Sequence, residues 1–187
     1  MDIKTKDDYI KSLKEQKHVV YYDGEKVEDV TPHPAFIPHI NAAAMTYEMA
    51  LRPEFEDLAT ATSHLTGERI SRFTHIHQSV EDLIKKVQLL RAIAHETGSC
   101  FQRCVGWDAL NASYMTTYDL DQKFGTEYHK RFIEYLKYIQ KTNKMVVGGM
   151  TDPKGDRSKP PCQQCDPDQF TRVAEKRDDG IIIRGAK

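Results

Sequence analysis

The centre of the chain carries the strongest constraint on the fold: a run of apolar residues at helical spacing with a cap at each end. Ser79 and Asp82 form a capping box with Asp in place of Glu, and Gly98 can end the helix in a left-handed conformation. The apolar positions between them recur every three or four residues, at Leu83, Ile84, Val87, Leu90 and Ile93. Similar patterns predict helices from residue 100 to about 120 and from 126 to 139. Three amphipathic helices with short joints indicate antiparallel neighbours in a bundle, so the sequence predicts a mainly α fold.

Shorter elements are predicted on both sides of this centre. Residues 5–17 favour a helix capped by Thr5, residues 19–28 a β-hairpin, and residues 41–51 a helix capped by Asn41 after a proline-rich crossing segment. Residues 145–168 indicate an ordered loop, and residues 171–184 a hairpin around Asp179 and Gly180. We therefore expect a helical domain over residues 1–150, and over 151–187 a loop and the first hairpin of a β-domain. Because the chain stops directly after an apolar strand, we expect it to be the first part of a longer protein.

The composition narrows the class of function. The 187 residues carry a net charge of −1 and 39% hydrophobic residues, with a mean hydropathy of −0.64. Balanced charges argue against a nucleic-acid partner, and the absence of a long apolar run or signal peptide argues against a membrane. Four cysteines without a secretion signal favour metal or redox chemistry in the cytoplasm over a disulfide framework.

Cys100 and Cys104 are the most informative of these cysteines. Four residues apart on a helix, two thiols point the same way, as ligands of a soft metal centre do, although one such spacing can also arise by chance. Ser99 as cap and Gln102 three residues later complete a capping box and make Cys100 the first helical residue. At that position the helix dipole favours the thiolate, so we predict a metal or redox role for the pair.

A second pair, Cys162 and Cys165, has the spacing of zinc knuckles and redox motifs. All four thiols together could form one tetrahedral site. The second pair lies in a proline-rich loop far along the chain, and two unrelated pairs are the alternative interpretation.

Polar candidates surround the first cysteine pair in sequence. His77, with His75 just before it, could ligate a metal, bind a substrate carbonyl or contact a flavin, and simple hydrogen bonding at a helix entry is the alternative. Arg91 could meet an anionic substrate group or be an ordinary surface arginine. A further loop can grip phosphates or the polar edge of a flavin with its backbone amides; its sequence is Met150-Thr151-Asp152-Pro153-Lys154-Gly155-Asp156-Arg157-Ser158. The chain has no Rossmann or P-loop fingerprint.

Several strings together resemble the 4-hydroxyphenylacetate 3-hydroxylase flavoprotein family, and within it the branch that dehydrates 4-hydroxybutyryl-CoA and isomerises vinylacetyl-CoA. The resemblance runs from Tyr9 to Lys187 and rests on the segments 41–47, 60–67, 75–79, 100–104 and 151–158. The cysteine pair distinguishes the branches, because the aromatic hydroxylases carry substrate-binding Arg and Tyr in this helix. The dehydratase branch uses cysteines to hold a 4Fe–4S cluster.

The resemblance implies the N-terminal helical domain of an acyl-CoA-dehydrogenase-like fold, with small β-hairpins and the start of a middle β-domain, assembled as a homotetramer. It implies FAD and a 4Fe–4S cluster as cofactors and an acyl-CoA substrate, with a radical dehydration of the thioester. Cys100 and Cys104 match two cluster ligands, and the loop 150–158 matches the FAD-contacting segment. We expect Gln102, Arg91 and His77 in the active site, and the 187 residues alone to be inactive, because the remaining ligands lie elsewhere.

Two other functions stay open on the sequence. One is a flavin-dependent aromatic hydroxylase of the same family. The other is a non-catalytic helical module that binds zinc through all four thiols.

Overall fold

The computed structural model describes residues 4–98 and 100–187. The chain divides into two compact units, Met1–Val147 and Gly148–Lys187. The first unit is mainly helical, with two small β-hairpins, and the second is built on a third hairpin. The predicted class, mainly α with small hairpins, is therefore confirmed.

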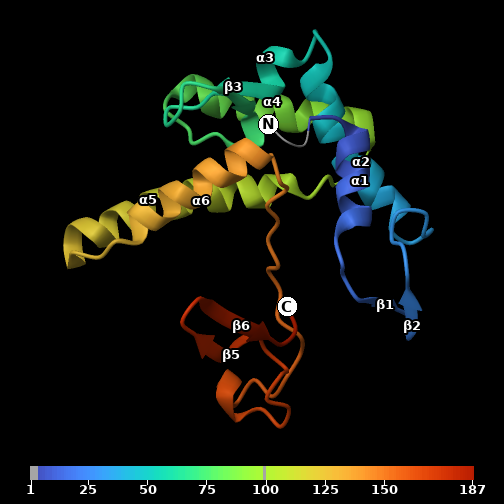
Figure 1. Ribbon diagram of the computed structural model, residues 1–187, viewed down its shortest axis with the longest axis vertical. Helices are drawn as coiled ribbons and strands as arrows, with labels where there is room; N and C mark the ends of the chain where they lie inside the picture. The colour runs from blue at the N-terminus through green and yellow to red at the C-terminus, as the bar shows by residue number, and fades with distance from the viewer. Residues whose placement is uncertain (1–3, 99) are drawn as a thin grey trace. The chain divides into compact units, whose positions relative to one another are not determined.

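The elements of the first unit are labelled in Figure 1. Its α-helices are α1 (Lys6–Glu15), α2 (Ile37–Glu48), α3 (Glu56–Ala59), α4 (Val80–Thr97), α5 (Arg103–Phe124) and α6 (Tyr128–Thr142), and its 3₁₀ turns are η1 (Met49–Leu51) and η2 (Arg72–Thr74). Its antiparallel strand pairs are β1 (Val20–Tyr22) with β2 (Glu25–Val27), and β3 (Thr60–Thr62) with β4 (Arg69–Ser71).

Local capping chemistry sets the ends of α1 and α4 as predicted. The Thr5 side chain accepts a hydrogen bond from the Asp8 backbone N–H, and the Asp8 carboxylate accepts one from the Thr5 N–H, closing a capping box. Ser79 accepts from the Asp82 N–H in the same way. Gly98 ends α4 with a φ of 59°, the left-handed conformation that glycine adopts without steric cost.

The start of α2 differs from its prediction. The helix begins at Ile37, with Pro38 in its first turn, and Asn41 lies inside it and does not cap it. Proline fits the first turn because the backbone N–H that it lacks would have no partner there. The helix ends at Glu48 and continues as the 3₁₀ turn η1.

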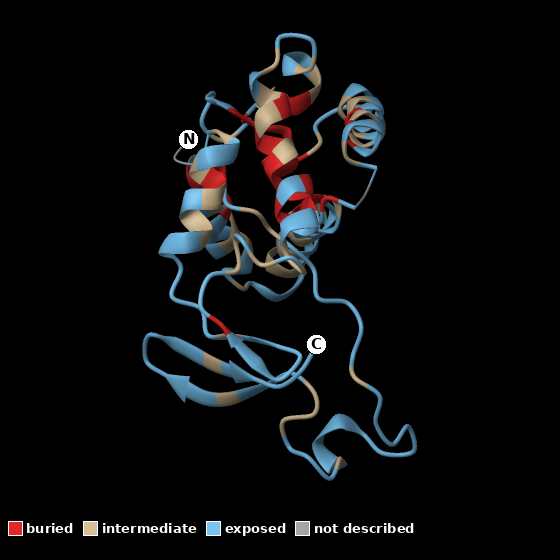
Figure 2. Cartoon of the chain, turned by 90° about the vertical axis from the view of Figure 1, so that its right-hand side faces the viewer, coloured by how far each residue is buried: buried red, intermediate tan, exposed pale blue. Residues whose placement is uncertain are grey.

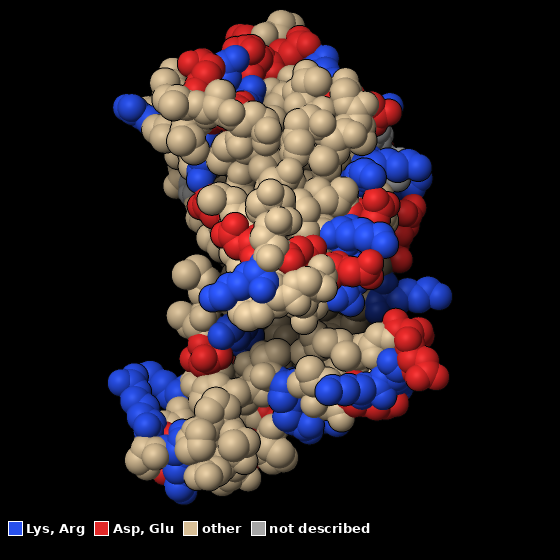
Figure 3. Space-filling model, turned by 90° about the vertical axis from the view of Figure 1, so that its left-hand side faces the viewer, with Lys and Arg blue, Asp and Glu red and all other residues tan. Residues whose placement is uncertain are grey.

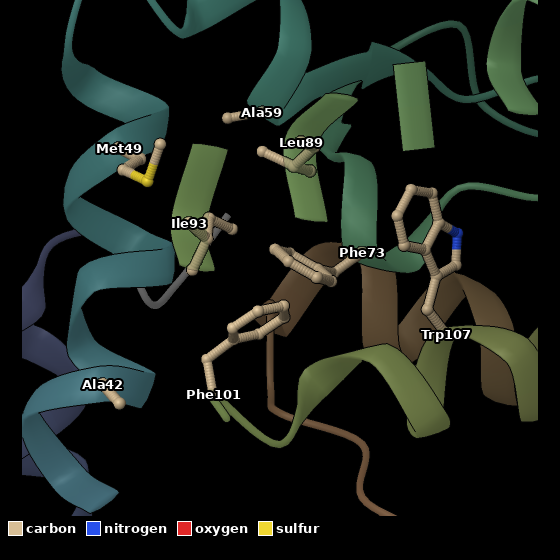
Figure 4. Packing of buried hydrophobic residues seen from close by; sticks show 8 residues of the cluster. All are labelled: Ala42, Met49, Ala59, Phe73, Leu89, Ile93, Phe101 and Trp107. Carbon is tan, nitrogen blue, oxygen red and sulfur yellow. The ribbon is translucent and has the colours of Figure 1, made fainter. Parts of the chain in front are cut away.

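The three long helices do not form the predicted three-helix bundle. α5 and α6 lie side by side, joined by a short turn at Gly125, whereas α4 packs against α2 and α3. Figure 4 shows the resulting core, in which aromatic rings from η2, from α5 and from the turn before α5 meet aliphatic side chains of α4. The members of this main core are Ala42, Met49, Ala59, Phe73, Leu89, Ile93, Phe101 and Trp107.

Only part of the predicted apolar stripe of α4 is buried. Ile93 is fully enclosed in the main core, whereas Leu83, Ile84 and Val87 remain 49%, 46% and 55% exposed. The apolar side chains in the N-terminal half of the helix therefore lie outside the main core and are exposed to solvent.

The second unit consists of a loop with one 3₁₀ turn, η3 (Pro161–Gln163), followed by β5 (Arg172–Arg177) and β6 (Gly180–Arg184). The two strands pair antiparallel with a bulge between Val173 and Glu175, which confirms the predicted hairpin. No residue of this unit is buried, and Figure 2 shows its strands mostly in the colour of exposed residues.

Among the described residues, no helix has the length and apolarity needed to cross a membrane. On the face drawn in Figure 3, basic and acidic side chains are interspersed, in keeping with the net charge of −1.

Candidate functional site

The two thiols of the first cysteine pair flank a turn, and the prediction that both lie on one helix is wrong. α5 begins at Arg103, so Cys104 is its second residue and Cys100 precedes it. Cys100 is exposed, Cys104 is half-buried against the main core, and both are free thiols. The predicted cap Ser99 lies outside the described residues. Gln102 does not complete a capping box, because it occupies the N-cap position itself without a side-chain cap.

The turn is set by a left-handed backbone at Gln102, whose φ is 63°. For a residue with a Cβ this conformation costs about 1–2 kcal/mol and must be imposed by its neighbours. Phe101 and Arg103, on either side of it, are 6% and 2% exposed, and both contact the Phe73 ring. Burial of these two side chains determines where α5 begins. Gln102, which lies between them, is exposed to solvent.

Arg103 is buried without a carboxylate hydrogen-bonded to it in the part of the chain that the structure describes. Its guanidinium donates to Thr46 Oγ1 at 3.1 Å and to Asn143 Oδ1 at 3.0 Å. The guanidinium carbon lies 4.5 Å from the Tyr47 ring centroid and 4.7 Å from that of Phe73. Burial lowers the pKa of Arg103, and the side chain stays charged at neutral pH because an arginine pKa starts above 12.

The segment that carries the predicted His77 is fastened to α5, one to two turns beyond Cys104. Trp107 Nε1 and Asn111 Nδ2 donate to the His75 carbonyl at 2.8 and 3.2 Å, and the His77 backbone N–H donates to Asn111 Oδ1 at 2.9 Å. Trp107 and Asn111 lie three and seven residues after Cys104, on the same side of the helix. The segment that carries His77 is thus held on the side of α5 to which Cys104 belongs.

The His77 imidazole has an unusual environment. Its ring lies 5.1 Å from that of Trp107, and among the described residues neither ring nitrogen has a hydrogen-bond partner, although both atoms are buried. Burial, and next the nearby Lys86, lower the pKa of His77, so the ring is neutral at pH 7. Lys86 itself pairs with Asp108 on α5. Burying a hydrogen-bond donor and an acceptor without partners costs free energy of folding. We therefore regard the two ring nitrogens of His77 as candidates for binding a ligand.

Asp82, at the start of α4, joins His75 and Arg72. One Asp82 oxygen lies 3.2 Å from His75 Nε2 and 3.1 Å from Arg72 Nη1. Burial alone would raise the pKa of Asp82, but hydrogen bonds from the Gln78 N–H, His75 and Ser79 reverse this and hold the pKa well below its usual range. Arg72 is 4% exposed and also donates to three backbone carbonyls, of Asp57, Leu58 and Thr60. This cluster secures the β3–β4 hairpin and the entry to α4.

The cluster borders an open hollow of about 730 Å³, whose lining includes Glu56, Asp57, Arg69, Arg72, His75 and Asp82. Neither thiol contributes to this lining, so the hollow is separate from the cysteine turn. Arg91 is elsewhere again, on an exposed position of α4, and no hydrogen bond or ion pair joins it to another described residue. In the described part of the chain, Arg91 is thus joined to neither Gln102 nor His77 by a hydrogen bond or ion pair.

The predicted cofactor loop, residues 150–158, belongs to the second unit and is held by its own contacts. Gln164 accepts from the Asp156 N–H at 3.0 Å and donates to the Asp156 carbonyl at 2.9 Å, and Asp156 also accepts from the Ser158 N–H and hydroxyl. These hydrogen bonds with Ser158 contribute most to lowering the pKa of Asp156. The loop encloses a hollow of about 240 Å³ lined by residues 152–157 with Lys159, Gln164 and Phe170.

Cys162 and Cys165 are free and exposed on either side of the end of η3. Within either unit, the described residues bring together no group of three His, Cys, Asp or Glu side chains that could hold a metal ion. Each cysteine pair therefore supplies at most half of a four-ligand site from its own unit. One metal site shared by all four thiols and two unrelated cysteine pairs both stay predictions.

Sequence reasoning missed Arg103, Asn111 and the Asp82 cluster as parts of this region. An arginine at the start of a helix normally faces solvent, and the aromatic residues that enclose Arg103 come from distant segments. For Asp82 a signal existed, since its role as a cap was predicted from Ser79, but its contact with Arg72 was not.

The fold and the cysteine turn define a class of protein: the chain belongs to the family described as 4-hydroxyphenylacetate 3-hydroxylase N terminal, whose model matches residues 5–187. The family predicted from the strings is thus confirmed. Within it, the chain is 55% identical over 183 residues to 4-hydroxybutyryl-CoA dehydratase/vinylacetyl-CoA-Delta-isomerase from Clostridium aminobutyricum, an alignment that covers 98% of this chain and 37% of that protein.

Solved structures give the same picture. An oxygen-tolerant archaeal 4-hydroxybutyryl-CoA dehydratase from N. maritimus matches with a TM-score of 0.90 at 49% identity, over 99% of this chain and 37% of that one. The oxygenase component of 4-hydroxyphenylacetate 3-monooxygenase, solved with FAD and 4-hydroxyphenylacetate, matches with a TM-score of 0.76 at 28% identity, over 98% and 37% of the two chains. The chain therefore spans 37% of the length of each of these relatives.

Proposed function

We propose that the full-length protein dehydrates 4-hydroxybutyryl-CoA to crotonyl-CoA and isomerises vinylacetyl-CoA, with FAD and a 4Fe–4S cluster as cofactors. The observation that carries this proposal is the 55% identity to a dehydratase over 98% of the chain, with two free thiols at the turn that opens α5. The aromatic hydroxylase alternative rests on a more distant relative, at 28% identity.

The donor chemistry of the turn fits an iron–sulfur cluster. Cys100 and Cys104 are unpaired, one is exposed and the other half-buried, and thiolates are the usual cluster ligands. Since no third ligand joins them within the described part of their unit, they would supply two of four ligands, and the others would come from beyond these residues. When bound, an incompletely cysteine-ligated cluster supplies an iron that can act as a Lewis acid on the leaving hydroxyl.

The loop 150–158 fits the polar part of a flavin. Lys154 and Arg157 line its hollow together with Asp156, so both charge signs are available to phosphates and ring heteroatoms. A Cβ at Gly155 would lie 2.3 Å from Gln169 Nε2, so a side chain there would displace the end of this glutamine, which donates to the Lys154 carbonyl of the loop. A relative solved with FAD at 28% identity supports this assignment.

The chain's own polar groups have distinct tasks in this proposal. His77 is neutral and unpartnered, so it can accept or hold a proton of the substrate at a ring nitrogen. Gln102 lies between Cys100 and Cys104 in the chain, and its exposed amide can hydrogen-bond a substrate held at the cluster. Arg91 is an exposed cation on α4 that can bind an anionic group of the CoA thioester.

We extend the proposal to the architecture. Residues 1–150 would form the helical domain of an acyl-CoA-dehydrogenase-like fold, and residues 151–187 the flavin-contacting loop and first hairpin of a middle β-domain. The full-length protein would act as a cytoplasmic homotetramer.

Anaerobic absorption spectra with a product assay test the function. A broad iron–sulfur band beside the flavin peaks, together with crotonyl-CoA formed from 4-hydroxybutyryl-CoA, is the expected result. Flavin peaks alone, with phenol-dependent oxygen consumption, would instead establish the hydroxylase. One tightly held zinc that is lost on Cys162→Ser would establish the zinc module.

A further inference from the structure

We propose that Arg103 is the positioning residue of the cysteine turn: its buried guanidinium holds Cys100 and Cys104 in the arrangement that one cluster requires. The inference rests on the proposed function of these thiols as cluster ligands. Arg103 has no task in the chemistry described above, yet it is among the largest fully enclosed side chains of the chain, at 2% exposure.

The first support is the set of elements that Arg103 connects. Its two terminal nitrogens donate to Thr46 on α2 and to Asn143, the residue that caps α6. Thr46 is fixed in turn, because its hydroxyl donates to the Ala43 carbonyl at 2.6 Å, and Tyr47 donates to the Asn143 carbonyl at 3.1 Å. One side chain at the first position of α5 therefore ties this helix to two others.

The second support is the aromatic enclosure. The guanidinium lies against the Tyr47 ring and the Phe73 ring, at 4.5 and 4.7 Å. Cation–π contacts take the place of a carboxylate, which is absent from the hydrogen bonds of Arg103 among the described residues. A planar fork that donates at both ends while lying on aromatic rings is specific to arginine, and a lysine ammonium cannot reproduce it.

The third support is the strained residue beside it. Gln102 keeps its left-handed backbone because Phe101 and Arg103 are both anchored in the core, and the Arg103 N–H also donates to the Phe101 carbonyl at 2.9 Å. The two thiols lie on opposite sides of Gln102 in the chain. A substitution that removes the Arg103 guanidinium should therefore let the backbone at Gln102 relax and change the distance between the two thiols. The other residues that pack around Phe73 would stay in place.

The test uses Arg103→Met and Arg103→Lys in the full-length protein, with Arg131→Met as the matched control because Arg131 is exposed on α6. Iron and sulfide content, the electron paramagnetic resonance of the reduced cluster, and circular dichroism are measured together. We expect both Arg103 variants to hold about tenfold less cluster, as loss of charge-assisted hydrogen bonds implies, and the control to match the unmodified protein. A folded Arg103→Met variant with full cluster content and an unchanged spectrum overturns the inference.

A cluster-free assay separates this inference from the proposed function. In a Cys162→Ser/Cys165→Ser background, alkylation of half-buried Cys104 should become about tenfold faster in Arg103→Met, since the turn no longer shields it. An unchanged rate overturns the role of Arg103, whereas a cluster missing from the unmodified protein refutes the proposed function. Should both Arg103 variants fail to fold, Thr46→Val removes the hydrogen bond from Arg103, together with the local one from the Thr46 hydroxyl to the Ala43 carbonyl, and leaves the bond from Arg103 to Asn143 in place. Faster Cys104 alkylation in that variant supports the inference, and an unchanged rate overturns it.

Discussion

Replacing Gly106 by alanine should destabilise the helical unit, although alanine is the better helix former. Gly106 lies on α5, two residues after Cys104, and a Cβ built on it would sit 1.8 Å from the Val146 carbonyl oxygen and 2.3 Å from its carbon. Helix propensity favours alanine by about 1 kcal/mol, whereas overpacking a core costs roughly 1–3 kcal/mol. The clash is with backbone, which cannot rotate away, so we take the upper end and expect a net loss of about 2 kcal/mol.

Thermal unfolding of the Gly106→Ala variant measures this loss. For a chain of this size we expect Tm to fall by about 4–8 °C. Ala109→Gly, at an exposed position of the same helix, is the matched control and should lose only the propensity term of about 1 kcal/mol. A Gly106→Ala variant as stable as the unmodified protein, or more so, would refute the close approach of α5 to the segment after α6.

Two further predictions concern Asp82 and Gln102. Because the folded-state pKa of Asp82 lies below its unfolded value of about 3.9, the stabilisation by its contacts is complete above about pH 3.9 and is lost as the pH falls from there through the folded-state pKa. Asp82→Asn should therefore lower the free energy of unfolding in urea at pH 7 and flatten its decline in acid, and an unchanged acid limb contradicts this. Gln102→Gly relieves the left-handed strain and should stabilise the fold by about 1 kcal/mol, while product formation falls with loss of the amide. A lower Tm in this variant is incompatible with the strained turn.

The elements predicted correctly are those whose ends depend on neighbouring residues alone. Thr5 and Ser79 cap their helices through hydrogen bonds to residues three positions on, and Gly98 ends α4 by its own conformational freedom. Such interactions are encoded within one turn of helix. The β3–β4 hairpin was not predicted, because its three-residue strands are held by Arg72, whose guanidinium donates to the carbonyls of Leu58 and Thr60.

The site shows the same division. Cys100 and Cys104 were identified from their spacing, but their geometry was not, because the start of α5 is decided by burial of Phe101 and Arg103 in a core made of distant segments. The burial of the two unpartnered ring nitrogens of His77 likewise depends on its packing against Trp107, a contact between distant residues that no local sequence pattern encodes.

The most direct test of the central claim is the iron and sulfide content of two matched double variants of the full-length protein, purified without oxygen. We predict that Cys100→Ala/Cys104→Ala loses the cluster and crotonyl-CoA formation together, whereas Cys162→Ala/Cys165→Ala retains both. A cluster that survives removal of Cys100 and Cys104, or that disappears with Cys162 and Cys165, contradicts the assignment of the α5 thiols as its ligands.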